Sequence, residues 1–224
     1  MQFKHAPAAV SAKFDDPNLV SAAGLVPMLR LARSAGLDQL AQVRLTVPSD
    51  KGANAGGKVM ALVAGMLAGA DSIDDMNLLR HGGMGRLFDR TYAPSTLGSF
   101  LREFRFGHVR QLDAVASRTL VNVAQSAPLL RASNDERVMV DLDDTIIEVH
   151  GYQKQGASFG YSGVRGLNAL FATASTSQSA PVIVGQRLRQ GKTGSPKGAA
   201  RIVADTLATL RRMDLGSSVR PLLR

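Results

Sequence analysis

Acidic residues alternate with apolar ones along a run of β-forming residues from Val138 to Val149. Because successive side chains of a strand point to opposite faces, Asp141 and Asp143 share one face and Asp144 lies on the other. Two neighbouring carboxylates on an apolar strand repel each other and are costly to desolvate. A divalent metal offsets both effects, and Mg²⁺ prefers carboxylate oxygen. The pattern predicts either a strand that carries metal ligands or an edge strand whose acids lie in water.

The excess positive charge of the chain follows this strand. Residues 150–224 carry 11 lysines and arginines against two acids, whereas residues 1–149 carry 16 of each sign. The basic segment therefore accounts for the whole net charge of +9. Such a segment favours a polyanionic partner, most simply the phosphates of DNA or RNA, and the alternative is solubility charge spread over a surface. The candidate phosphate contacts are Lys154, Arg165, Arg187, Arg189, Lys192, Lys197 and Arg201.

The composition excludes several classes of protein. The absence of cysteine removes disulfides and thiolate zinc sites. No stretch is long and apolar enough to span a bilayer, and the first residues lack the apolar core of a secretory signal. We therefore expect a cytoplasmic protein without a membrane partner.

Hydrophobic spacing divides the chain into two parts, with a boundary near residue 132. Residues 1–131 are expected to be mostly helical, and residues 132–224 to form three strands, a helix and the opening of a fourth strand. The strands are expected at 138–149, 167–176, 181–188 and 219–223, with a helix starting at Ser195–Pro196. Helices are expected over 19–47 with a stop at Gly36, over 59–70, from 72 to a break at 82–85, over 94–104 and over 108–127, and a short strand over 8–14. The predicted fold class is α+β.

Four segments of the second part resemble the DDE transposases of bacterial insertion sequences. They read DLDDT at 141–145, HGYQKQGA at 150–157, GVRGLNAL at 163–170 and GSPKGAAR at 194–201. The likeness is strongest to the group with a helical region ahead of the DDE domain, and it continues upstream through 14–19, 70–75, 78–83 and 107–113. It spans nearly the whole chain. The resemblance implies a helical N-terminal region followed by the first half of a ribonuclease H-like domain, with three antiparallel strands and then a helix.

The resemblance also implies a chemistry. Such enzymes move DNA by phosphodiester hydrolysis and strand transfer, with two Asp and one Glu holding two Mg²⁺ ions. The Asp-x-Thr pattern at 143–145 makes Asp143 the expected first metal ligand and catalytic acid, with Asp141 as the second choice. The implied partner is double-stranded DNA at insertion-sequence ends, within the nucleoid, and a homodimer is compatible with the family.

The sequence departs from the family pattern at its later acids. The resemblance places the second Asp at the end of the fourth strand and the Glu on a helix beyond it, and neither finds a match in residues 1–224. Asp205, within the last helix, and Asp214, just after it, do not replace them. Because the acids of one strand are too few to fix two metal ions, we expect a truncated transposase that is inactive alone, with 219–223 as an unprotected edge.

Two other functions remain open at this point. The segment Val140–Thr145 also resembles the first motif of haloacid dehalogenase-like phosphatases, in which Asp141 would be the nucleophile and Asp143 the acid/base. Alternatively, the chain is a non-catalytic DNA-binding or repressor fragment. Its helices over 95–104 and 108–123 would then form a helix-turn-helix, with Arg102, Arg105, Arg110 and Arg118 nearby, or simply two antiparallel helices of a bundle.

Overall fold

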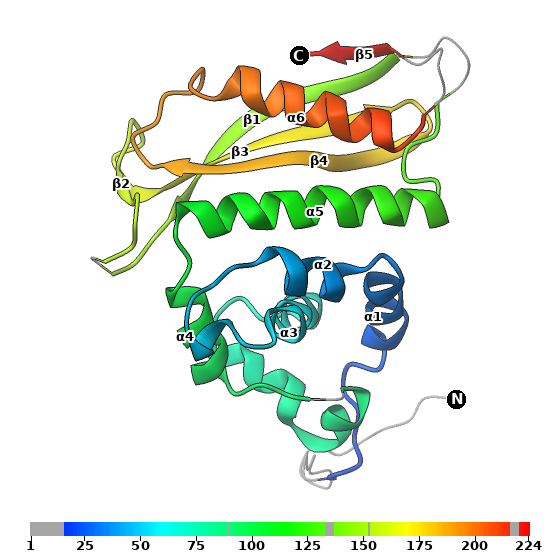
Figure 1. Ribbon diagram of the computed structural model, residues 1–224, viewed down its shortest axis with the longest axis vertical. Helices are drawn as coiled ribbons and strands as arrows, with labels where there is room; N and C mark the ends of the chain where they lie inside the picture. Colours follow the sequence, from blue (N-terminus) through cyan, green and yellow to red (C-terminus); the bar gives the residue numbers. More distant parts are fainter. Residues whose placement is uncertain (1–15, 89, 133–136, 152, 216–219) are drawn as a thin grey trace, which may run out of the picture.

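One long helix, α5 (Phe106–Ser126), lies between a helical part and a β-sheet part in the computed structural model of the chain (Figure 1). The structure describes residues 16–88, 90–132, 137–151, 153–215 and 220–224. The strand expected over 8–14 lies outside these residues. Val115 of α5 is buried in the helical part, and Val121, farther along the same helix, belongs to the core of the sheet part. Both parts therefore pack on the same helix.

The helical part begins with two helices that meet at a glycine, as the sequence predicts. Gly36 has a φ of +73° and separates α1 from α2, because this left-handed conformation suits a residue without a side chain. Pro94 opens α4, where the missing N–H of proline costs no helical hydrogen bond. The helices are α1 (Leu25–Ser34), α2 (Leu37–Arg44), α3 (Ala55–Leu67) and α4 (Pro94–Arg102), and the 3₁₀ helices are η2 (Asp50–Gly52), η3 (Asp74–Arg80) and η4 (Gly82–Leu87).

Three local predictions for the helical part were wrong. Residues 74–87 form two 3₁₀ helices instead of one α-helix with a break, although the Ser72 N–H donates to the Asp75 carboxylate at 3.0 Å. The glycines there allow close approach, since a Cβ on Gly83 would lie 2.7 Å from the carbonyl oxygen of Asn18. The helix expected over 108–127 already begins at Phe106, and the helix expected over 59–70 already begins at Ala55.

The sheet part has the topology that the sequence predicts. Strands β1 (Arg137–Glu148), β3 (Arg165–Thr176) and β4 (Ser179–Gln190) are consecutive antiparallel neighbours, and the short β2 (Ser158–Phe159) also pairs with β3. Helix α6 (Ala199–Arg212) then crosses the sheet, as a parallel connection requires. The chain returns in β5 (Arg220–Leu223), which runs parallel to β1 on its free side. The α+β class is confirmed.

The two faces of the sheet differ in what covers them. Helix α6 lies over one face (Figure 1). On this face Val138 and Val140 of β1, Ala172 of β3 and Ile202 of α6 are almost completely buried. The opposite face stays open among the described residues, since Ile147 and Ile183 are about half exposed there and Asp143 is exposed. The alternation of β1 therefore separates a core face from a face that is open to a ligand.

We predict that Ile202→Ala lowers the free energy of unfolding by about 2–5 kcal/mol, because it leaves a cavity between α6 and the sheet. The same change at exposed Ile183 is expected to cost about 1 kcal/mol or less. Urea unfolding followed by circular dichroism measures both. Equal losses for the two variants would contradict the assignment of the core face.

Candidate active site and nucleic-acid interface

Asp141 and Asp143 lie on the open face of an inner strand. β1 has β3 on one side and β5 on the other. The backbone pairing with β5 reaches only to Leu142, so Asp143 lies just past the paired stretch on that side. The Asp143 side chain is exposed, and its Oδ1 accepts a hydrogen bond of 2.9 Å from the N–H of Asp144. The predicted alternation is confirmed, because the Asp144 side chain points to the opposite, helix-covered face, where it contacts Arg189.

Asp141 is held by the residue that follows β5. Both carboxylate oxygens of Asp141 accept hydrogen bonds from Arg224, from Nε at 2.6 Å and from Nη2 at 3.1 Å. The N–H of Arg224 also donates to the carbonyl oxygen of Val140, which extends the parallel pairing of β5 with β1. The hydrogen bonds to Asp141 raise the pKa of the Arg224 guanidinium. A cation therefore already neutralises Asp141, whereas no described cation pairs with Asp143.

Asp144 belongs to a buried network that joins three strands and a loop. Its Oδ2 accepts from Arg189 Nη2 at 2.6 Å and from Asn168 Nδ2 at 2.8 Å. Arg189, on β4, also donates from Nε to Asn168 Oδ1 at 2.8 Å. Its Nη1 donates to the carbonyl oxygens of Ser195 and Lys197, which lie just before α6. Every nitrogen of the Arg189 guanidinium thus has an acceptor, which is what a buried arginine requires.

The described acids do not by themselves form a site for two metal ions. Within the described ranges there is no group of three or more His, Asp or Glu side chains close enough to hold a metal. Asp141 and Asp143 share a face, but Arg224 engages the first, and two carboxylates leave most positions of a magnesium ion unfilled. Asp205, which the sequence places among apolar neighbours, instead contacts Arg110, Arg187 and Arg201. We therefore derive no metal-dependent step from these residues alone.

The seven predicted phosphate contacts fall into two groups. Lys154, Lys192 and Lys197 are exposed, and none of them has an acidic partner among the described residues. The four arginines make contacts within the chain. Arg165 donates to the carbonyl oxygens of Val149 and Gly151, Arg187 and Arg201 pair with Asp205, and Arg189 lies in the buried network.

Four of these seven residues meet around one cavity of about 570 Å³. Its wall is largely apolar and is built from the start of α5, from β3 and β4 and from the segments at 154–156 and 193–198, with Phe106 64% exposed. The basic residues that line it are Arg105, Lys154, Arg187, Arg189 and Lys197. Aromatic surface beside cations is typical of sites that take unstacked bases and phosphates.

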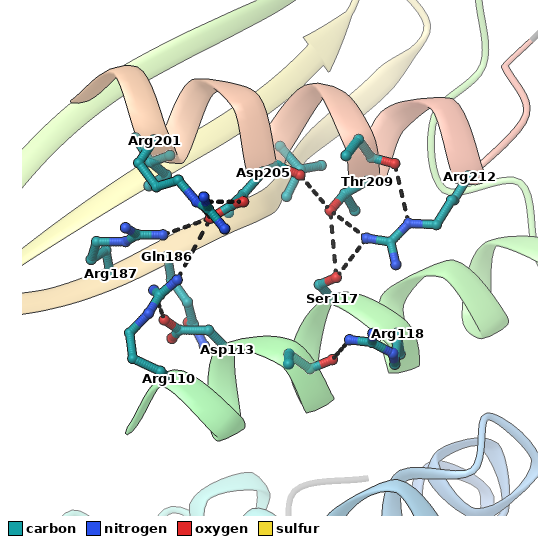
Figure 2. Close-up of a pocket in the computed structure, with 15 residues that line it drawn as sticks. Arg110, Asp113, Ser117, Arg118, Gln186, Arg187, Arg201, Asp205, Thr209 and Arg212 are labelled. Carbon is teal, nitrogen blue, oxygen red and sulfur yellow. Dashed lines mark hydrogen bonds and ion pairs between the residues drawn. The ribbon is translucent and has the colours of Figure 1, made fainter. Parts of the chain in front are cut away.

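A second cavity, of about 310 Å³, lies between α5, β4 and α6 (Figure 2). Five arginines and two aspartates line it: Arg110, Arg118, Arg187, Arg201, Arg212, Asp113 and Asp205. Burial raises the pKa of the Asp113 carboxyl to about 6, against the opposing effects of Arg110 and Arg187. Figure 2 shows Arg110, Arg187 and Arg201 gathered around Asp205, so acids and arginines neutralise each other at that end.

Comparison with known families identifies the chain. The family model "Transposase DDE domain group 1" matches residues 4–223. The chain belongs to this family of transposase DDE domains. No curated protein and no solved structure matches it. Among the described helices, none has the length and apolar character needed to cross a membrane.

Sequence reasoning missed the partners of the aspartates of β1. Asn168 lies in a segment that resembles the family, yet only the pairing of β3 with β1 and β4 reveals that it bridges Asp144 and Arg189. Arg224 reaches Asp141 only because β5 is parallel to β1. Both contacts follow from the pairing register of the strands, which a single sequence does not reveal.

We predict that Arg189→Met lowers the free energy of unfolding by about 3–5 kcal/mol, because it leaves the Asp144 carboxylate uncompensated. Adding Asp144→Asn should recover part of this loss, since the pair is then removed together. The control is Arg137→Met, an exposed arginine of the same sheet, which should change stability by about 0.5 kcal/mol or less. Guanidinium unfolding measures all three variants, and additive losses in the double variant would contradict the network.

Proposed function

We propose that residues 1–224 supply the DNA-binding surface and the first catalytic acid, Asp143, of a Mg²⁺-dependent DDE transposase that acts on insertion-sequence ends. The single observation that carries this proposal is an exposed acid on an inner strand, in a chain that belongs to the transposase DDE family. The working location is then the bacterial nucleoid in the cytoplasm, and the partner is double-stranded DNA.

The geometry favours Asp143 over Asp141 as the metal ligand. Arg224 holds both oxygens of Asp141, whereas the Asp143 carboxylate has no described cationic partner. The resemblance places the second catalytic Asp at the end of the strand that is β5 here. Leu223 of β5 lies opposite Val140, so continued parallel pairing would bring positions just past Arg224 alongside Asp143. Two acids from separate segments would thus converge on one face of the sheet.

Residues 1–224 are not expected to cleave DNA alone. A two-metal site needs several carboxylates around both ions, and on the open face of β1 Asp143 is one available ligand while Asp141 is paired with arginine. What the described chain offers is a docking surface for phosphates and one anchor for a metal. Strand transfer requires further acids that converge on Asp143.

The phosphatase alternative is less compatible with the strand order. In the haloacid dehalogenase reading, the acidic strand should end at its motif and lead through a helix to a parallel neighbour. Here β1 continues to Glu148, and the next full-length strand, β3, is antiparallel to it. The helix-turn-helix alternative is disfavoured because α5 packs on both the helical core and the sheet core, which leaves it little free surface for a DNA groove.

We predict that the chain binds duplex DNA with an affinity that falls steeply with salt. The double variant Lys154→Gln/Lys197→Gln should reduce the slope of log K against log salt by about 2, because two phosphate contacts are lost. Arg30→Gln/Arg80→Gln removes the same charge from exposed sites of the helical part and should leave the slope nearly unchanged. Fluorescence anisotropy with a labelled duplex gives both slopes. Identical slopes for the two double variants would show that DNA does not bind at the surface around Lys154 and Lys197.

We predict no nicking or joining of supercoiled plasmid by residues 1–224 in Mg²⁺ or Mn²⁺. Cleavage that is abolished in Asp143→Ala would show that the acids of this chain suffice, against the proposal. Phosphate release from a small phosphomonoester, lost in Asp141→Asn, would support the phosphatase instead. Agarose gel mobility and a colorimetric phosphate assay distinguish these outcomes.

A further inference from the structure

The cavity of Figure 2 has two electrostatically different ends. At one end, Asp113 and Asp205 neutralise the neighbouring arginines. At the other end, Arg118 of α5 and Arg212 of α6 have no carboxylate within ion-pair distance in the described part of the chain. Positive charge therefore accumulates at one end of the cavity only.

Arg118 is held among like charges. Its only described hydrogen bond is from Nη1 to the carbonyl oxygen of Ala114, at 3.0 Å, so most of its donors have no acceptor among the described residues. Burial lowers the pKa of the Arg118 guanidinium, and repulsion from Arg44 and Arg212 lowers it further. Arg118 and Arg212 line the same cavity from α5 and α6, and neither has a described carboxylate partner.

Two hydroxyl groups position Arg212 at this end. Its Nη2 donates to Ser117 Oγ at 3.0 Å and to Thr209 Oγ1 at 3.2 Å, and its Nε donates to the carbonyl oxygen of Ala208 at 3.1 Å. Ser117 Oγ accepts from Arg212 and also lies 3.5 Å from Thr209 Oγ1. The guanidinium is thus oriented by neutral groups.

We propose that Arg118 and Arg212, which line the acid-free end of this cavity beside Ser117, bind a phosphate group there. Arginine suits this task because its planar donors match phosphate oxygens, and an anion relieves the repulsion between the two guanidinium groups. The source of the phosphate is the backbone of DNA, a step that rests on the proposed function. The site joins α5 and α6, and α5 itself packs on both the helical core and the core of the sheet part.

The test uses two arms with Arg118→Gln/Arg212→Gln and, as control, Arg211→Gln. Arg211 is exposed on α6 next to Arg212 and has no described polar contact of its side chain. In the first arm, inorganic phosphate should raise the melting temperature of the wild type and the control above that in chloride at equal ionic strength, but not that of the double variant. In the second arm, the double variant should bind duplex DNA more weakly, by roughly tenfold or more near 0.1 M salt, with a salt slope smaller by about 2.

A third variant separates binding from folding. Arg118→Lys/Arg212→Lys keeps both charges and should restore most of the salt slope. A double glutamine variant with unaltered phosphate response and DNA affinity overturns the site. A lost phosphate response with unaltered DNA affinity overturns DNA as the source and leaves a free anion. If wild type responds to phosphate but binds no duplex at any salt, the proposed function fails while the anion site stands.

Discussion

The buried Arg189 guanidinium is the contact on which the sheet part depends. It ties Asp144 of β1 to Asn168 of β3, and its remaining donors fix the loop that leads into α6. A buried ion pair repays the cost of desolvation only when its other donors are satisfied, and here the strands and the loop supply all acceptors. The network therefore fixes the start of α6 over one face of the sheet, and by doing so it leaves the other face open.

This arrangement explains why the three neighbouring aspartates of β1 have different surroundings. Asp144 points inward and is neutralised by Arg189, so it stabilises the fold. Asp141 and Asp143 point outward, and the parallel strand β5 brings Arg224 to the first of them. Of these three, only Asp143 keeps an exposed carboxylate without a described cation beside it. Under the proposed function Asp143 is the first catalytic acid, and the fold exposes it without placing a bare charge in the core.

The large elements of the fold were predictable from the sequence because each depends on local spacing. The alternation over 138–149 predicted β1 and its two faces, and the resemblance predicted three antiparallel strands followed by a helix. Residues 74–87 were mispredicted because the close approach of residues 18 and 19 to the glycines decides their conformation, and that contact is not local. The partners of the acids were missed for the same reason. Asn168 and Arg224 reach their aspartates across 24 and 83 residues of sequence.

The structure adds most to the sequence by showing which charged side chains already have partners within the chain. A count of lysines and arginines treats Arg189 and Arg118 alike, yet the first has every nitrogen satisfied and the second has a single hydrogen bond. Internal acids and carbonyl groups engage most of the predicted arginines. The cations that remain available to phosphates are the exposed lysines around the apolar cavity and the arginines at the acid-free end of the second cavity. Both sets lie along α5, which packs on the helical core and on the sheet. Phosphates bound along this helix would therefore favour one arrangement of the two parts, which links DNA binding to the position of the open acidic face.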